Sequence, residues 1–317
     1  MLLWVGIVHG EPERSGSWQL REKIGQPVAV PIVFSDRSAA DLLDMAPALV
    51  ARGSRGVICV AGQPFPQAPG SRTALREIRE HLASMGLRHV FLRAEPLRED
   101  AVDRRALDAF INRTEDLART ARWCGASGLW LDLPVTASLF DPDHPITGEE
   151  LEKIGRRLYA AIARRFPDAD VLVWGGPEGA PGPRWLNFLE GLFEGAGVAD
   201  SPRVTLVTAV DAPAAGYASV AAATGGVERM VAASFSLENR ERWERLGGVS
   251  ALLKMDAYYR MASQAGAEAA SGSFRVARDA AVALSDRWVI LGLAREANQQ
   301  QVDPELRLVS PLRGMIR

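Results

Sequence analysis

Short apolar runs alternate with segments of helical period along most of the chain. Eight of these runs are rich in Val, Ile and Leu, and such sequence is typical of strands covered on both faces in a parallel sheet. The expected strands occupy residues 28–34, 56–62, 89–95, 128–133, 171–176, 204–210, 229–235 and 288–294. Amphipathic segments expected to be helices lie at 39–53, 72–86, 104–126, 148–166 and 183–197. The pattern therefore predicts repeated units of strand and helix.

The segment 148–166 illustrates the helical period. Leu151, Leu158 and Ile162 recur at spacings that place them on one helical face. Thr147 and Glu150 have the spacing of a capping box, in which two side chains satisfy backbone N–H groups at the start of a helix. The sequence thus predicts a helix that begins just after Thr147.

Eight such units favour a parallel sheet covered by helices. A chain of 317 residues fits a closed (β/α)8 barrel, or TIM barrel, better than an open doubly wound sheet. No expected strand is followed by GxGxxG or GxxxxGKS/T, the phosphate-binding signatures of the open alternative. We expect the barrel to cover 28–317, with an N-terminal extension over 1–27 that packs on it. Between the seventh and eighth strands, residues 239–287 form an extended segment, which we expect to be helical near 246–265 and 274–286 and to supply an extra helix or a lid.

The inward face of each strand follows from the alternation of side chains. Leu129 and Leu131 suit the helix side of the fourth strand, which turns Trp130 and Asp132 into the barrel. In (β/α)8 enzymes the chemistry lies at the C-terminal mouth. The polar residues that fall late in their strands and are expected at this mouth are Arg93, Glu95, Asp132, Asp211, Glu238 and Glu296.

Each of these residues also has a purely structural interpretation. A carboxylate at a strand end commonly caps the next helix or pairs with a neighbouring arginine, and Arg93 is able to balance one of the acids. The tryptophans commonly fill a core. No His or Lys stands at a clear strand end to complete a metal-dependent site.

Composition excludes several classes of protein. With 47% hydrophobic residues the chain can bury a sizeable core. A formal net charge of −2 gives no basic surface for nucleic acid, which we therefore do not expect as a partner. No run approaches the length of a membrane span, and the first ten residues lack the features of a signal peptide. We expect a cytoplasmic protein by default, unless a leader has been removed. Cys59 and Cys124 lie in apolar surroundings and have no CxxC partner or nearby His, so we expect no zinc site at them and assign no metal ligand in the leading hypothesis.

Paired carboxylates beside aromatic rings favour a glycoside hydrolase. Cleavage of a glycosidic bond needs one carboxyl group as proton donor and another as nucleophile or base, and aromatic rings supply flat surfaces for sugars. We expect Asp132, Glu238 and Glu296 to be the catalytic residues. The residues expected to bind a carbohydrate ligand around them are Trp130, Trp174, Trp288, Arg93, Glu95, Asp211 and Tyr217. This chemistry requires no cofactor.

A family resemblance agrees with this hypothesis. The runs "GASGLWLDLP", "TGEELEKIGRRLYAAIARRFPDADVLVW", "FLEGLFEGA" and "RWVILGLAREAN" resemble a group of largely uncharacterised bacterial glycoside-hydrolase-like (β/α)8 barrel proteins. The fourth strand is also similar to the chitinase signature. In the group, an Asp ends the fourth strand, a Glu follows two positions later, and a Glu closes the eighth strand. Asp132 and Glu296 match the first and last of these acids, whereas Pro134 stands where the second is expected.

Two other functions remain open. A barrel that has kept a sugar cleft but lost an acid at Pro134 would bind a carbohydrate or a partner without cleaving it. Alternatively, several of the carboxylates could hold Mg²⁺ or Mn²⁺ in a metal-dependent lyase or hydrolase.

Overall fold

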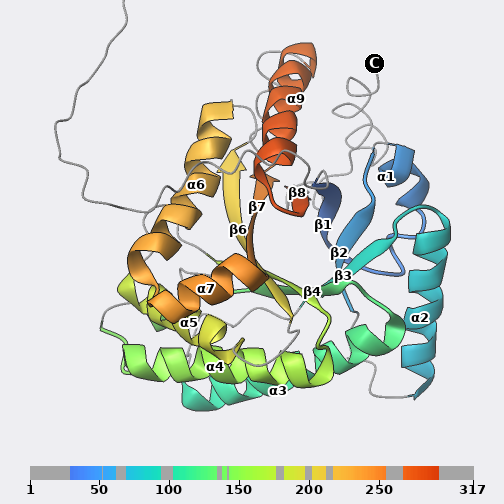
Figure 1. Ribbon diagram of the computed structural model, residues 1–317. Coiled ribbons are helices and arrows are strands. Elements are labelled where there is room, and N and C mark those ends of the chain that lie inside the picture. The colour runs from blue at the N-terminus through green and yellow to red at the C-terminus, as the bar shows by residue number, and fades with distance from the viewer. Residues whose placement is uncertain are drawn as a thin grey trace, which may run out of the picture.

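The computed structural model describes residues 29–51, 53–61, 69–93, 103–133, 138–140, 143–175, 182–196, 202–211, 217–254 and 267–292. Eight parallel strands close into a barrel in sequence order, with β8 hydrogen-bonded to β1. Helices surround this barrel, as Figure 1 shows. The predicted (β/α)8 fold is therefore confirmed. The expected N-terminal extension over 1–27 lies outside the described residues.

The strands share the parallel pairing of the barrel and differ mainly in length. They are β1 (Val30–Ser38), β2 (Gly56–Val60), β3 (His89–Arg93), β4 (Gly128–Asp132), β5 (Asp170–Trp174), β6 (Arg203–Asp211), β7 (Gly247–Lys254) and β8 (Trp288–Gly292). The helices include α1 (Ala46–Ala51), α2 (Pro69–Ser84), α3 (Arg104–Cys124), η1 (Ser138–Phe140), α4 (Gly148–Arg165), α5 (Pro183–Gly195), α6 (Tyr217–Ser234), α7 (Leu237–Leu246) and α9 (Ala267–Leu284).

Capping residues mark the ends of several helices. Thr147 and Glu150 form the predicted capping box at the start of α4, with both reciprocal hydrogen bonds present. Gly125 ends α3 at φ 74°, a left-handed conformation that glycine adopts without steric cost. The first predicted helix is shorter than expected, because 39–45 form turns and α1 begins only at Ala46, one residue before Pro47.

The seventh strand was predicted in the wrong place. Residues 229–235 belong to α6 and the turn that follows it, and β7 is instead Gly247–Lys254, inside a stretch expected to be helical. In α6 the buried residues Val220, Thr224 and Val231 recur at helical spacing. Both α6 and α7 therefore lie between β6 and β7, and the described part of the β7–β8 connection is the helix α9. The extended segment expected over 239–287 contains most of α7, the whole of β7 and α9.

The barrel wall separates two apolar cores. Outward residues such as Leu129 and Leu131 join the large core beneath the helices. The inward residues form a second cluster that fills the barrel, made of Ile32, Ile58, Phe91, Trp130, Leu172, Val207, Leu252, Trp288 and Ile290. The predicted facing of the fourth strand, with its leucines outside and Trp130 inside, is confirmed.

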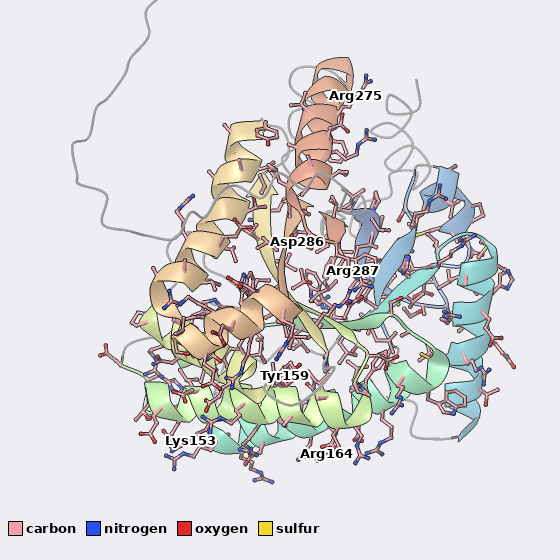
Figure 2. All side chains as sticks on the ribbon, viewed as in Figure 1. Lys153, Tyr159, Arg164, Arg275, Asp286 and Arg287 are labelled. Carbon is pink, nitrogen blue, oxygen red and sulfur yellow. The ribbon has the colours of Figure 1, made fainter. Side chains whose placement is uncertain are left out.

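The N-terminal end of the barrel is held by an ion pair and an aromatic contact. Asp170, the first residue of β5, accepts a hydrogen bond of 2.9 Å from Arg287, which lies just before β8. Figure 2 labels Arg287. The Trp288 ring meets the edge of His89 at 4.9 Å and Phe91 at 5.1 Å between ring centroids. Packing at this end of a barrel serves stability, because the chemistry of these folds lies at the other end.

Candidate active site

The last inward residues of several strands meet at the C-terminal mouth of the barrel. Their facing follows from the strand alternation, since Leu252 and Ile290 lie in the inner cluster two residues before Lys254 and Gly292. The described inward residues near this end of the barrel include Phe34, Arg93, Asp132, Trp174, Lys254 and Gly292. This set contains three of the predicted site residues.

Arg93 and Asp132 form a buried ion pair at the mouth. The Arg93 Nη2 donates to the Asp132 Oδ2 over 2.5 Å, and the two side chains are only 8% and 5% exposed. Arg93 lies opposite Trp130 in the register between β3 and β4, so its guanidinium reaches toward the next inward residue of β4. Two charges buried together need each other, because removal of either leaves an uncompensated charge in a poorly hydrated place. The pair therefore fixes the position of Asp132.

Aromatic rings lie directly beside this pair. The Arg93 guanidinium stands 4.9 Å from the centroid of the Phe34 ring, a cation–π distance. Phe34 contacts Trp130 at 5.0 Å, and Trp130 contacts Trp174 at 6.1 Å between centroids. Trp130 is fully buried, and within the described structure its indole N–H has no hydrogen-bond acceptor. The mouth therefore combines one buried carboxylate with an aromatic wall.

The backbone just after β4 and β5 holds Asp132 and Trp174 together. Leu133 N–H donates to the Trp174 carbonyl over 2.8 Å, which continues the pairing of Asp132 with Trp174. Gly175 has φ 149°, and a Cβ there would lie 1.6 Å from the Leu133 carbonyl oxygen. Only glycine allows this close approach, so Gly175 is a supporting residue of the site.

Some predicted site residues are only partly described. Glu95 and Glu296 lie outside the described residues. Asp211 is the last residue of β6 and pairs with Lys254 in the register, but its side chain is also outside the described part. Tyr217 is the first residue of α6, with 57% of its surface exposed.

Trp288 does not lie at the mouth. It is the first residue of β8, is buried, and packs against His89 and Phe91 at the N-terminal end of the barrel. The prediction that Trp288 contacts a sugar beside Asp132 is thus not matched by its position. The Trp288 ring fills the barrel core, which is the structural role considered above for the tryptophans.

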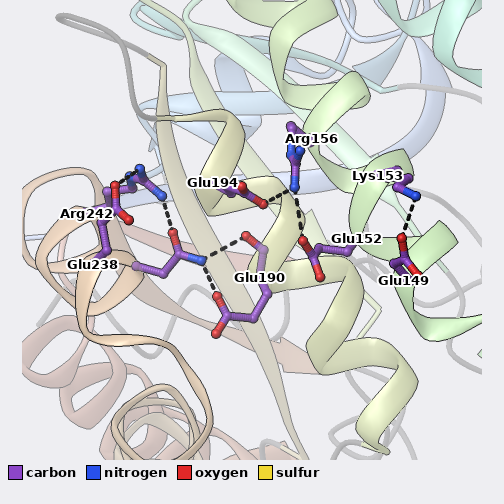
Figure 3. Close-up of polar contacts among 9 residues, drawn as sticks. Glu149, Glu152, Lys153, Arg156, Glu190, Glu194, Glu238 and Arg242 are labelled. Carbon is purple, nitrogen blue, oxygen red and sulfur yellow. Dashed lines mark hydrogen bonds and ion pairs between the residues drawn. The ribbon is translucent and has the colours of Figure 1, made fainter.

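Glu238 is also elsewhere. It lies in the first turn of α7 and pairs with Arg242 four residues later, with 74% of its side chain exposed. Figure 3 shows this pair near Glu190, together with Arg156 of α4 in contact with Glu152 and Glu194. The Asn239 side-chain amide donates a hydrogen bond to the Glu190 carbonyl oxygen. Burial, followed by the neighbouring Glu194, raises the pKa of Glu152. The expectation of Glu238 at the mouth followed from a seventh strand over 229–235, and the true β7 removes that reason.

Lys254 is the mouth residue that the sequence analysis missed. It ends β7, pairs with Asp211 of β6 and Gly292 of β8, and is partly buried. The expectation that no lysine stands at a strand end was wrong, because it followed from the misplaced strand. The signal in the sequence was the apolar run "VSALLK", which closes on a lysine.

The described residues contain no group of three or more His, Cys, Asp or Glu side chains gathered as metal ligands would be. Within the same residues, every helix is too short or too polar to cross a bilayer.

Comparisons with known proteins establish the class of fold. The sequence matches no family model and no curated protein. Among solved structures it is similar to the probable 3-DHS dehydratase AsbF from Bacillus anthracis, with a TM-score of 0.50 and 13% identity over 91% of this chain and 99% of that one. It is also similar to an exo-beta-1,4-mannosidase from Opitutaceae bacterium strain TAV5, with a TM-score of 0.50 and 12% identity over 95% of this chain and 58% of that one.

A third similar structure is endonuclease IV from Thermus thermophilus, with a TM-score of 0.48 and 17% identity over 90% of this chain and 96% of that one. Similarity at such low identity shows a shared fold and nothing about chemistry. The closed sheet makes the chain a (β/α)8 barrel protein, and solved structures similar to it at a TM-score of 0.50 include an exo-beta-1,4-mannosidase and a probable 3-DHS dehydratase.

Proposed function

We propose that the protein is a glycoside hydrolase that acts on a poly- or oligosaccharide at the C-terminal mouth of its barrel. The observation that carries the proposal is the buried Arg93–Asp132 ion pair beside the Phe34, Trp130 and Trp174 rings. A sugar ring presents C–H groups to aromatic faces and an anomeric carbon to a carboxylate. Phe34 and Trp174 are partly buried and would supply the aromatic contact, with the fully buried Trp130 behind them, and Asp132 would supply the carboxylate.

The proposed role of Asp132 follows from its partner. The Arg93 guanidinium holds the Asp132 carboxyl group in a fixed position at the mouth. The role proposed for Asp132 is that of nucleophile, base or stabiliser of the positive charge that develops on the sugar. Arg93 would hold Asp132 in place through the ion pair between its guanidinium and the Asp132 carboxylate, both of which are buried.

The proton donor would be a second carboxylic acid. The proposed donor is Glu296, four residues after β8 ends at Gly292. Glu95, two residues after β3 ends at Arg93, and Asp211 at the end of β6 would bind the substrate. Strands that end at one mouth deliver such residues to the same space. Trp174 and Tyr217 would contact sugars further from the reacting bond.

A second candidate is a carbohydrate-binding barrel without hydrolase activity. Two observations favour it: Pro134 replaces the acid expected two positions after Asp132, and Asp132 itself is engaged by Arg93. In that case the aromatic wall would bind a glycan, and no bond would be cleaved.

Glycan release distinguishes the two candidates. Wild-type protein is incubated with a panel of polysaccharides and 4-nitrophenyl glycosides, and new reducing ends and nitrophenol are measured. For a glycosidase, Asp132→Asn and Glu296→Gln are each expected to lower release by about a hundred- to ten-thousand-fold. Glycan binding by the wild type without release at any pH between 4 and 9 would instead support the binding barrel.

Asp170→Asn is the matched control. Among the described residues Asp170 is a second buried aspartate that pairs with an arginine, but it lies at the opposite end of the barrel. Its substitution changes the same chemical group without touching the mouth. Because Asp132→Asn is expected to lose more stability than Asp170→Asn, release is compared under conditions in which both variants are folded. Equal loss of release there would show that the chemistry of Asp132 is not what lowers the activity.

A further inference from the structure

Arginines gather at the N-terminal end of the barrel, on the side of β2 and β3. Arg55 comes directly before β2 and Arg88 directly before β3, and both are exposed. The His89 N–H donates to the Arg55 carbonyl oxygen over 3.1 Å, so the two strand starts lie side by side. Burial lowers the pKa of His89, and the charges of Arg287, Arg88 and Arg79 lower it further. Arg79 of α2 therefore also lies close to this point.

The end of α3 brings a fourth arginine to the same side. Arg122 is exposed in the last turn of α3, and its Nη1 donates to the Arg165 carbonyl oxygen over 3.5 Å. Arg79 lies against this helix end, since a Cβ at Gly125 would be 3.7 Å from the Arg79 Cζ. Helices of a (β/α)8 barrel run antiparallel to the strands, so they end where strands begin. We call the four arginines the basic patch: Arg55, Arg79, Arg88 and Arg122.

No acid pairs with the basic patch within the described residues. None of its four arginines forms an ion pair there. Helices α2 and α3 carry five acids, which are Glu77, Glu80, Asp108, Glu115 and Asp116. Four of the five pair with arginines outside the patch, and Glu77 is exposed. The patch therefore keeps its positive charge, although the whole chain has a formal net charge of −2.

An exposed tryptophan lies next to the basic patch. Trp123 directly follows Arg122 in the last turn of α3, and 43% of its surface is exposed. The other tryptophans of the described part of the chain are buried or half-buried. The Trp123 indole therefore presents a flat apolar face to water beside unpaired positive charges.

This combination suits one kind of partner. Guanidinium groups bind phosphates through paired hydrogen bonds, and an aromatic ring stacks on a nucleobase. A single-stranded nucleic acid offers phosphates and unstacked bases along the same chain, whereas the bases of a duplex are already stacked on one another. An acidic peptide would use the charges of the patch but has no base for the indole.

We infer that the basic patch and Trp123 form a surface that binds single-stranded nucleic acid. The arginines would hold successive phosphates, and Trp123 would stack on a base. The surface lies at the end of the barrel opposite the mouth, so the inference is independent of the proposed hydrolase activity.

Fluorescence anisotropy of the full-length protein tests the inference. The probe is a fluorescein-labelled oligouridylate of about fifteen nucleotides, titrated between about 50 and 300 mM NaCl. A dissociation constant of about 1–100 μM is expected near physiological salt. Contacts to about three or four phosphates would make the logarithm of the association constant fall against the logarithm of the salt concentration with a slope of about −2 to −3.

The variants separate the charge from the ring. Arg88→Gln and Arg122→Gln are each expected to make the slope shallower by about 0.7, the value for one phosphate contact. Trp123→Ala is expected to weaken binding by about five- to a hundred-fold and to leave the slope unchanged. Arg104→Gln is the matched control, because Arg104 begins α3 at its other end, is exposed and pairs with Glu150. It is expected to change neither quantity.

Three outcomes would overturn the inference. The first is no binding of the oligouridylate at the lowest salt concentration. The second is an equal effect of Arg104→Gln and Arg88→Gln. The third is a polyglutamate that competes as well as unlabelled oligouridylate while Trp123→Ala has no effect, which would assign the patch to acidic proteins. Circular dichroism checks that each variant is folded.

Discussion

Asp132 and Asp170 are buried aspartates at opposite ends of two adjacent strands. Asp170 begins β5 opposite Gly128, and Asp132 ends β4 opposite Trp174, so they are four residues apart along the strand direction, or about 13 Å. Each pairs with an arginine, Arg93 for Asp132 and Arg287 for Asp170. The barrel therefore offers a chemically matched pair of sites, one at its mouth and one at its base.

The two sites differ in how far the arginine is exposed to water, and therefore in the cost of leaving it without its aspartate partner. Arg93 is almost completely buried, whereas 42% of the Arg287 side chain is exposed to water. We expect Asp132→Asn to lower the free energy of unfolding by about 3–5 kcal/mol, because it leaves a buried charge uncompensated. Asp170→Asn is expected to cost about 1 kcal/mol or less, because Arg287 remains hydrated. Urea unfolding followed by circular dichroism measures both values.

A double variant tests whether the unpaired Arg93 charge causes the loss of stability in Asp132→Asn. Arg93→Met combined with Asp132→Leu removes both charges and is expected to recover most of the stability that Asp132→Asn loses. If the double variant were as unstable as Asp132→Asn, the loss would come from packing at the mouth and not from the unpaired guanidinium.

His89 gives the stability a dependence on pH. Burial is the main cause that lowers the pKa of His89 below its ordinary value of 6.5, and the charges of Arg287, Arg88 and Arg79 add to it. The folded state then binds fewer protons than the unfolded state, so stability is lost as pH falls from 6.5 through the lowered pKa. The slope from one such group cannot exceed about 1.4 kcal/mol per pH unit.

We expect His89→Gln to flatten this slope in urea unfolding series between pH 5 and pH 7. His81→Gln, at an exposed position on α2, is the control and should keep the slope of the wild type. Asp170 acts in the opposite direction: its pKa is raised above 3.8, chiefly by burial, so its contribution grows as pH falls. A slope unchanged in His89→Gln would assign the acid sensitivity to another group.

Both cysteine thiols are expected to be unreactive in the folded protein. Cys59 is fully buried on β2, and burial, with Cys124 as the lesser cause, raises its pKa to about 12. Burial likewise raises the pKa of Cys124 at the end of α3. Since the thiolate is the reactive form, Ellman's reagent at pH 8 should react only as fast as the protein opens, and should detect two thiols per chain in guanidinium. Fast reaction of the native protein would contradict this burial.

Two glycine variants are expected to change stability in opposite directions. Gly226 lies inside α6, where an added Cβ would meet nothing nearer than Arg229 Nη2 at 4.0 Å. Gly226→Ala should therefore stabilise the protein by about 1 kcal/mol through helix propensity. At Gly128 an added Cβ would lie 1.8 Å from the Asp170 carbonyl oxygen, so Gly128→Ala should cost about 1–3 kcal/mol. Chemical denaturation of the two variants measures both effects.

The apolar pattern predicted seven of the strands, and together with the chain length and the absence of phosphate-binding motifs it predicted the closed fold. It failed at β7 because the period of a short apolar run does not separate helix from strand. "RMVAASF" and "VSALLK" are both apolar, but only the second pairs in register with β6 and β8. Because of that error, Glu238 was predicted to lie at the mouth of the barrel and Lys254 was not.

By itself the sequence determined which way Trp130 and Asp132 face, because the alternation of β4 with Leu129 and Leu131 is a local property of the strand. Only the tertiary structure decided that Arg93 is the partner of Asp132, that Trp288 lies at the far end of the barrel, and that Lys254 faces the mouth. These relationships depend on the register between strands far apart in the chain, and that register is set by closure of the whole barrel.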